Sequence, residues 1–293
     1  MILSLAAALL VATPATLNTT VAAAKPGDTV RFAPGVFTDL LIQNKQWSPA
    51  VTLDMRGADV TTVRIQKSSG LNVIGGTFRP LASGPLWQPA VVVADSQDVR
   101  FADGQFIGAG HSGRGLIVRD SRNVAVTGAR FTYLHIGIQY LETRGGEISR
   151  TRFDDMRSDG INIAASHQIV VDQIECRDFS VGDGDHPDCV QLWSIKGKPP
   201  TSDIVIKNSK AIGAMQGFCG FDHDAGGFDR ITVTGNTVHT RFPQGIAMYE
   251  ARDSVISGND VSTMPGSKFR TRIRSDQKST RVERNREAEY RER

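Results

Sequence analysis

The densest group of reactive side chains in the sequence lies between residues 177 and 198, where His186, Pro187 and Asp188 follow one another. The proline restricts the backbone between the histidine and the aspartate, which favours one fixed arrangement of the two side chains. A carboxylate beside an imidazole orients the ring and stabilises its protonated form, so that the ring can exchange a proton near neutral pH. The triplet therefore predicts an acid–base site.

The preceding segment repeats this spacing. Arg157 and Asp159 are separated by one residue, as His186 and Asp188 are, and the two pairs hold the same place in consecutive segments. Lys196 is an alternative base, a role that requires a lowered pKa. Basic and acidic groups that converge from adjacent segments are typical of acid–base catalysis. The catalytic candidates are therefore His186, Asp188, Arg157, Lys196 and Asp159.

The same stretch contains an acidic turn, Asp183-Gly-Asp185. Asp and Gly are favoured in turns, which is the simplest interpretation. Together with Asp188 these carboxylates could instead bind Ca²⁺, although the spacing is not that of an EF-hand. Asp183 and Asp185 are thus the candidate metal ligands, and no other cofactor is implied. A second acidic turn, Asp222-His-Asp224, leaves the turn and ligand interpretations equally open.

These residues lie within a repeat that extends from Ala90 to Met264. Each segment opens with an apolar run, and these runs are Ala90-Val-Val-Val, Gly115-Leu-Ile-Val, Gly137-Ile-Gln-Tyr, Gly160-Ile-Asn-Ile, Cys189-Val-Gln-Leu, Gly217-Phe-Cys-Gly and Gly245-Ile-Ala-Met. The steps between them are 25, 22, 23, 29, 28 and 28 residues, and the longest contains His186. A second alternating run follows in each segment. Period-2 alternation in such a repeat predicts the stacked coils of a parallel β-helix with one continuous core.

Strand alternation also predicts which side chains point away from the core. The third residue of each opening run points outward, so Gln139, Asn162 and Gln191 should form one column. Amides and carboxylates hydrogen-bond sugar hydroxyls, and we predict an extended polysaccharide groove here. Amide ladders that only stabilise the stack are the alternative. The substrate-binding candidates are Gln139, Asn162, Arg177, Gln191, Trp193, Gln216, Tyr133 and His135. For Tyr133 and His135, ordinary corner packing is the alternative.

The two ends of the chain differ from the repeat. Residues 1–15 have the apolar core of a signal peptide, which is too short to span a membrane. They lack a basic n-region, and a capping helix that runs to residue 24 is the alternative. Residues 16–266 are the expected β-helix domain with a short N-terminal cap helix. Residues 267–293 lose the alternation and mix charges densely, which predicts disorder or a frayed helix.

Composition agrees with a single domain of this kind. The chain has 293 residues, 29 glycines and 7% aromatic residues, which suits tight corners and β-branched interiors. Residues 268–293 hold ten Lys/Arg and five Asp/Glu, which leaves 24 basic and 26 acidic residues in residues 1–267. Without a basic stripe on the folded body, nucleic-acid binding is not expected. For the three cysteines, small buried thiols are preferred over a disulfide.

Two motifs carry a resemblance to known families. Ser158-Asp-Gly-Ile-Asn-Ile and His186-Pro-Asp-Cys-Val-Gln-Leu resemble the polygalacturonase pattern Asn-Thr-Asp-Gly-Ile, then Gly-Asp-Asp-Cys-Val/Ile-Ala-Ile. On this match Asp159 and Asp188 occupy two of that family's three aspartate positions. Pro187 replaces the first Asp of the pair, Met215-Gln-Gly217 replaces a later Gly-His-Gly, and no Arg-Ile-Lys follows. The resemblance therefore favours the fold more than hydrolysis.

His-Pro-Asp-x-Val/Ile-Gln with a following Trp is similar to secreted bacterial β-helix proteins grouped with polysaccharide lyases and mannuronan C5-epimerases. This resemblance implies the right-handed β-helix of the pectate-lyase-like superfamily over most of residues 25–265. It also implies a secreted or periplasmic protein that binds an acidic polysaccharide, and we expect a monomer without a membrane span.

The expected function is a polysaccharide lyase that acts on a uronic-acid polymer of the alginate or pectate type. Arg157 or Arg177 would bind the uronate carboxylate with help from the amides, His186 would be the base, and Tyr133 or His135 the acid. A C5-epimerase of the same polymer would need nearly the same groups. A hydrolase would need two carboxylates about 6.5–9.5 Å apart. A non-catalytic glycan-binding β-helix is the remaining alternative.

Overall fold

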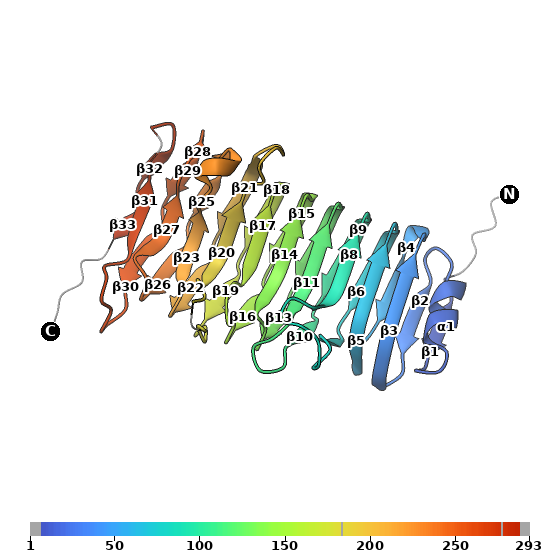
Figure 1. Ribbon diagram of the computed structural model, residues 1–293. Coiled ribbons are helices and arrows are strands. Elements are labelled where there is room, and N and C mark those ends of the chain that lie inside the picture. The colour runs from blue at the N-terminus through green and yellow to red at the C-terminus, as the bar shows by residue number, and fades with distance from the viewer. Residues whose placement is uncertain (1–6, 183, 277, 288–293) are drawn as a thin grey trace.

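The computed structural model describes residues 7–182, 184–276 and 278–287, which wind into one solenoid of stacked coils (Figure 1). The chain runs from α1 (Leu17–Ala23) at one end to β33 (Arg286–Glu287) at the other, and successive coils lie side by side. The strands form three ladders that run the length of the solenoid. This arrangement confirms the all-β parallel β-helix that the repeat predicted.

The first ladder is a 14-stranded sheet. Its strands are β1 (Leu9–Ala12), β2 (Thr29–Phe32), β4 (Gln46–Asp54), β6 (Ser69–Ile74), β9 (Gln97–Ala102), β12 (Arg122–Thr127), β15 (Arg144–Ser149), β18 (His167–Asp172), β21 (Thr201–Lys207), β24 (Phe228–Asp229), β25 (Thr232–Thr234), β28 (Ala251–Arg252), β29 (Val255–Ser257) and β32 (Arg281–Glu283). Among them, β9, β12, β15, β18, β21, β25 and β29 correspond to the second alternating runs of the repeat, and they pair in parallel.

The other two ladders share a 19-stranded sheet and meet at β5. The second ladder contains β3 (Gly35–Gln43), β5 (Ala58–Gln66), β8 (Pro89–Ala94), β11 (Arg114–Arg119), β14 (Ile136–Leu141), β17 (Ile161–Ala164), β20 (Asp188–Trp193), β23 (Gln216–Gly220), β27 (Gln244–Met248) and β31 (Arg272–Ser275). The third contains β7 (Thr77–Arg79), β10 (Gln105–Ile107), β13 (Arg130–Thr132), β16 (Arg152–Asp154), β19 (Glu175–Arg177), β22 (Lys210–Gly213), β26 (Thr237–Thr240), β30 (Asp260–Thr263) and β33.

One core fills the space between the three ladders. Leu116, Ile138 and Val190 occupy inward positions of the second ladder and are fully buried. The third ladder adds a stack of rings, with centroid distances of 4.8 Å for Phe78–Phe106, 4.3 Å for Phe106–Phe131 and 5.0 Å for Phe131–Phe153. Such ring pairs contribute about 0.5–1.5 kcal/mol each beyond the burial of their area.

The aromatic stack explains why glycine opens several runs of the second ladder. A Cβ atom at Gly137 would lie 2.7 Å from Cδ1 of Phe153 and 2.5 Å from the backbone oxygen of Gly160. Side chains cannot approach ring and backbone so closely, so only glycine lets the strand pass beside the ring.

At the N-terminal end, α1 covers the first coil with the buried side chains of Leu17 and Val21. This helix is the expected cap. Before it, β1 pairs with β2 and contributes the buried Ala12. A signal peptide over residues 1–15 would include β1, and cleavage there stays a prediction. No helix among the described residues is long and apolar enough to cross a membrane.

At the C-terminal end, the prediction of disorder or a frayed helix for residues 267–293 is wrong for most of the described residues. β31, β32 and β33 pair in parallel with β27, β29 and β30, so all three ladders continue into this segment. The sequence of this segment lacks the alternation of apolar and polar residues. Its strands are held instead by backbone hydrogen bonds to the preceding coil. Residues 288–293 lie outside the described residues.

Candidate functional site

A groove runs across β11, β14, β17 and β20 of the second ladder. Gln139 pairs with Asn162 and Asn162 with Gln191, so the predicted column of amides exists in the expected register. The cavity above it has a volume of about 530 Å³, which suits a ligand of several rings. Among its lining residues are Arg114, His135, Gln139, Asp159, Asn162, Asp185, His186, Gln191 and Trp193.

His186 lies at one side of the groove between two polar partners. Its Nδ1 is 3.2 Å from Oδ2 of Asp188, and its Nε2 is 3.1 Å from Nε2 of Gln216. If the amide nitrogen donates, Nε2 accepts and Nδ1 carries the proton toward Asp188. The hydrogen bond to Asp188 raises the pKa of His186, with burial acting in the opposite direction. This is the geometry of a base oriented by a carboxylate.

Asp159 and Asp188 form a buried carboxyl pair beneath the groove. Asp188 has no exposed surface, and its backbone N–H donates to Oδ1 of Asp159 at 2.9 Å. Burial first, and then the neighbouring Asp188, raise the pKa of Asp159 to about 7. Burial also raises the pKa of Asp188. Two carboxyl groups so placed hold a proton near neutral pH, which makes Asp159 a proton donor candidate.

Arg157 makes a different contact from the one expected. Its Nε donates to Oδ2 of Asp185 at 2.6 Å, and Nε2 of His135 lies 3.9 Å from the other oxygen of that carboxylate. Burial lowers the pKa of His135, so this ring is largely neutral at neutral pH. Arg157 is therefore neutralised by a loop carboxylate and is poorly placed to bind a substrate anion.

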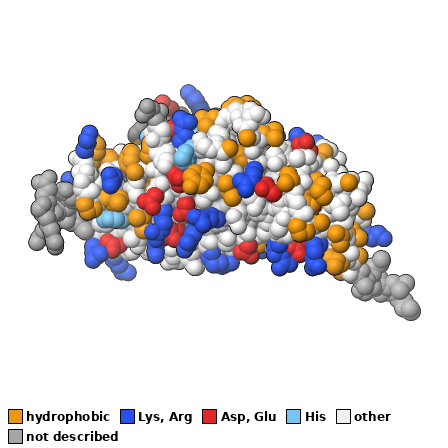
Figure 2. Space-filling model, turned by 90° about the horizontal axis from the view of Figure 1, so that it is seen from below, with side chains coloured by type: hydrophobic (Ala, Val, Ile, Leu, Met, Phe, Trp, Pro, Cys, Tyr) orange, Lys and Arg blue, Asp and Glu red, His pale blue; other side chains and the backbone are white. Residues whose placement is uncertain are grey.

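Arg177 is not in the groove. It lies in β19 of the third ladder, where its Nε donates to Oε1 of Glu175 at 2.7 Å. That ladder carries further ion pairs between coils, such as Arg130 with Asp154 at 3.0 Å. Figure 2 shows basic and acidic side chains interleaved along the face seen from below. The ion pairs of the third ladder show that the charge of Arg177, like that of Arg130, is compensated by a carboxylate of the same ladder.

Two other candidates also lie away from the cavity. Lys196 is exposed in the turn after β20 and is not among the lining residues. Tyr133 is 49% exposed and packs near His111, with ring centroids 5.6 Å apart, and it does not line the cavity either. The structure supports neither as a group that reaches a ligand in the groove.

The sequence overlooked Arg114 as a functional residue. It stands at the start of β11 in the outward column that also holds Asp188, and its Nη1 donates to Oε1 of Gln139 at 2.9 Å. Burial lowers its pKa, and Asp159 acts in the opposite direction. Its position in that column was the signal that could have identified it.

Buried polar atoms without a hydrogen-bond partner are concentrated in and beside the groove. Of nine such side-chain atoms among the described residues, six belong to the site: Arg114 Nε, His135 Nδ1, Asn162 Oδ1, both carboxylate oxygens of Asp188, and Gln216 Oε1. Of these six atoms, Oδ2 of Asp188 still has the imidazole of His186 at 3.2 Å, and the other five have no such contact. Unpaired buried polar groups are costly in a core, and their concentration is typical of a site that binds a polar ligand.

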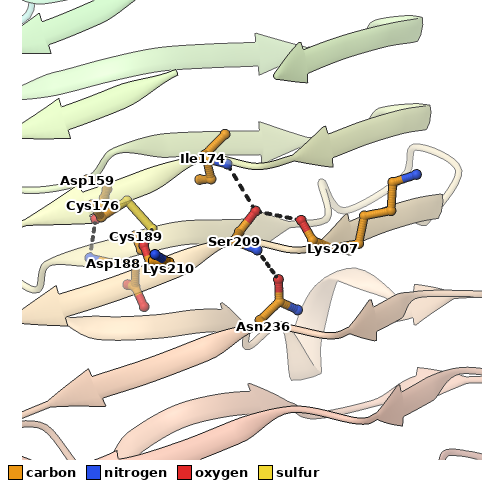
Figure 3. The surroundings of a disulfide bond; sticks show 9 residues. All are labelled: Asp159, Ile174, Cys176, Asp188, Cys189, Lys207, Ser209, Lys210 and Asn236. Carbon is orange, nitrogen blue, oxygen red and sulfur yellow. Dashed lines mark hydrogen bonds between the residues drawn. A yellow bond between two sulfur atoms is a disulfide. The ribbon is translucent and has the colours of Figure 1, made fainter. Parts of the chain in front are cut away.

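A disulfide closes the loop that carries His186. Cys176 in β19 and Cys189 in β20 are bonded, with Cα atoms 5.7 Å apart and a sequence separation of 13 (Figure 3). The expectation of buried thiols is therefore wrong for these two cysteines, and only Cys219 is a free buried thiol. Cys189 directly follows Asp188, so the bridge anchors one end of the loop beside the buried carboxyl pair (Figure 3).

The calcium interpretation receives no support. Asp185 is paired with Arg157 rather than with other carboxylates, and Asp183 lies outside the described residues. Within the described part of the chain, no group of three or more His, Cys, Asp or Glu side chains could hold a metal ion. Asp222 of the second acidic turn instead accepts a hydrogen bond from the backbone of Ser194.

Comparisons with solved structures agree with the geometry of the coils. Pectate lyase Pel9A matches with a TM-score of 0.64 and 13% identity over 94% of this chain and 80% of that one. An alginate lyase from Paenibacillus sp. FPU-7 has a TM-score of 0.53 and 13% identity over 94% and 99% of the two chains. A polygalacturonase from Erwinia carotovora has a TM-score of 0.53 and 15% identity, over 88% of this chain and 76% of that one.

The sequence itself gives two further results. Comparison with curated proteins found no match. The family model described as the right handed beta helix region matches residues 61–261, which include the groove and most of the coils. The chain therefore belongs to the right-handed beta helix family.

Proposed function

We propose that the groove is the active site of a polysaccharide lyase that acts on a uronic-acid-containing polymer of the alginate or pectate type. The observation that carries this proposal is His186, held between Asp188 and Gln216 at the side of a groove lined by amides and Trp193. The pectate and alginate lyases among the structural neighbours support the substrate class.

In the proposed reaction His186 removes the proton from C5 of a uronate unit. The entering sugar displaces the amide of Gln216 from Nε2, and Nε2 then accepts this proton, while Nδ1–H donates to Asp188 and spreads the positive charge that develops. The electron pair of the broken C5–H bond forms a C4–C5 double bond, and the C4–O4 bond breaks. Asp159, protonated near neutral pH, donates a proton to the departing O4.

The amides would stabilise the charge that develops on the uronate carboxylate. Asn162 and Gln191 present their side chains from adjacent coils on the floor of the groove. Hydrogen-bond donors fixed in advance need no reorganisation during the reaction, and the loss of one costs roughly 2.7–4 kcal/mol. Trp193, 41% exposed at the edge of the groove, offers a ring face for a sugar.

Two alternatives are less well supported by the contacts. An inverting hydrolase needs one carboxylate that activates a water molecule, whereas Asp188 has no exposed surface and faces His186. A purely binding groove would not require a histidine in line with a buried carboxylate. A C5-epimerase would use the same base, with reprotonation of C5 in place of cleavage.

One experiment separates these functions. Wild-type protein is incubated with alginate, with pectate and with a neutral polysaccharide, and ultraviolet absorbance of unsaturated ends is recorded together with reducing ends. A lyase raises both signals on a uronate polymer only. Reducing ends alone indicate hydrolysis, exchange of the C5 proton without cleavage indicates epimerisation, and binding without any reaction would overturn the enzymatic proposal.

The disulfide supports a related proposal about location. Disulfides persist in oxidising compartments, so Cys176–Cys189 agrees with a secreted or periplasmic protein. We further propose that the protein acts as a monomer, since one chain supplies every residue of the groove. Sedimentation of the purified protein tests this directly.

A further inference from the structure

The groove contains one cation, Arg114, that no ion pair with a described carboxylate neutralises. The carboxyl group whose charge acts on it is Asp159, and burial raises the pKa of Asp159 to about 7, so this group is largely protonated below that pH. Arg114 donates to the neutral amide of Gln139 through Nη1, and its buried Nε has no hydrogen-bond partner. None of the described carboxylates forms an ion pair with it. Arg157 and Arg177, by contrast, are each bound to a carboxylate of the protein. A partly buried guanidinium without an ion-pair partner favours an anionic ligand, because the pair would recover part of the cost of desolvation.

The position of Arg114 separates it from the base. β11, β14, β17 and β20 are consecutive in the second ladder, and coils are about 4.8 Å apart. Arg114 reaches the coil of β14 through Gln139, whereas His186 precedes β20 and contacts Gln216 on β23. The guanidinium and the imidazole are therefore about two coils apart along the groove, roughly 10 Å, and the charge of Asp159 acts on both.

This separation has a chemical consequence. In a uronate the carboxyl carbon is bonded directly to C5, so a carboxylate that reacts at His186 lies within the same few ångströms as the abstracted proton. Gln191 lies on the coil of the base and is the amide best placed to hold the carboxylate of the reacting unit, so a carboxylate at Arg114 belongs to another sugar unit of the same chain. We propose that Arg114 binds the carboxylate of a second uronate unit, and that the groove is therefore selective for runs of consecutive uronates. This inference rests on the proposed uronate polymer as ligand.

The test compares two polymers and three variants. The polymers are a homopolymeric polyuronate and a polysaccharide in which each uronate alternates with a neutral sugar. The variants are Arg114→Gln, Arg114→Lys, and Arg122→Gln as a matched control on the first ladder, away from the groove. Arg114→Gln should raise KM on the homopolymer roughly tenfold to a hundredfold, the usual worth of a charged hydrogen bond. The same substitution should change kcat on the homopolymer less than KM. On the alternating polymer it should leave KM nearly unchanged.

Arg114→Lys should recover part of the affinity, and Arg122→Gln should behave as wild type. An equal loss on both polymers would show that Arg114 only holds the groove in shape and would overturn the inference, as would full affinity of Arg114→Gln for the homopolymer. Titration of an oligouronate by calorimetry keeps the test independent of turnover. If the wild-type protein has no lyase activity but the oligouronate binds more weakly to Arg114→Gln than to the wild type, the inference is supported and the proposed function fails.

If Arg114→Gln does not fold, the wild-type protein still provides a test. Affinity for the homopolymer should fall more steeply with salt than affinity for the alternating polymer, since one more ion pair is formed with the former. Equal salt dependence of the two affinities would overturn the inference.

Discussion

Nδ1 of His186 lies 3.2 Å from Oδ2 of Asp188, and the two side chains differ sharply in exposure. The histidine side chain is 58% exposed, whereas the aspartate is completely buried. The carboxylate can therefore act on a ligand only through the imidazole. In this arrangement His186 meets the substrate, and Asp188 sets the proton affinity of His186. Substitutions of the two residues should therefore have different effects.

Replacement of His186 by Ala should lower turnover on a uronate polymer at least about a hundredfold, because a positioned base contributes that much. The melting temperature should change little, since the side chain packs against few neighbours and is more than half exposed. Rates and thermal melts of the variant check both statements. His167→Ala, in β18 of the first ladder, is the matched control and should keep its rate. Full activity of His186→Ala would remove this residue as the base.

The rate should depend on pH in a bell shape. The base must be neutral, and the hydrogen bond to Asp188 raises the pKa of His186 above its ordinary 6.5, so the rate rises as pH passes that raised value. Asp159 must be protonated, so the rate falls as pH rises through about 7. In Asp188→Asn the rising limb should move to lower pH. A rising limb that stays in place would contradict the assigned role of Asp188.

Stability should also depend on pH through Asp159. Its pKa is raised from 3.8 to about 7 in the folded state, so the folded protein binds this proton more tightly than the unfolded chain. The resulting stability is fully present below about pH 4 and is lost as pH rises to about 7. Since one pKa unit is worth about 1.4 kcal/mol, the change amounts to a few kcal/mol. Chemical denaturation at several pH values should reveal it, and Asp159→Asn should flatten the curve.

The outward columns followed from strand alternation alone. Because side chains alternate with a period of two, the repeat placed Gln139, Asn162 and Gln191 in one column, and their pairing is as expected. The partner of Arg157 could not be found in this way. Asp185 lies in the irregular loop before β20. The path of this loop depends on tertiary contacts, which no periodic pattern in the sequence reveals.

The disulfide did leave a signal in the sequence. Cys176 pairs with Phe153 in the third ladder and so takes the place of a ring. Cys189 takes the place of a glycine that opens other runs of the second ladder. A side chain fits at that position only where the neighbouring phenylalanine ring is missing. A cysteine in place of the ring and a cysteine in place of the glycine, in the same coil, therefore predict that the two cysteines touch. The third ladder itself was missed because its strands of two to four residues are too short to show alternation.

Removal of residues 268–293 should lower the stability of the protein, although the sequence of this segment predicted disorder or a frayed helix. Ile273 of β31 pairs with Ile246, and Val282 of β32 pairs with Ile256, so the deletion uncovers core side chains and leaves strand edges open. A lower melting temperature and aggregation on heating are expected. The deletion should leave the groove residues in place, so any loss of rate should follow the loss of folded protein. An unchanged melting temperature would show that these strands do not cap the core.

Loss of the disulfide should affect the loop more than the coils. The bridge closes a short loop of the unfolded chain, which corresponds to roughly 3 kcal/mol of stability, and Cys176→Ala/Cys189→Ala should lose about that much. Turnover should fall as well, because Cys189 holds the strand that begins with Asp188, and so the pair with His186 loosens. Dithiothreitol should reproduce both effects in the wild type and add nothing in the double variant. Cys219→Ala, which keeps the bridge, is the control and should remain sensitive to the reductant. Equal rates for reduced and oxidised protein, measured while circular dichroism confirms the fold, would show that the loop positions His186 without the bridge.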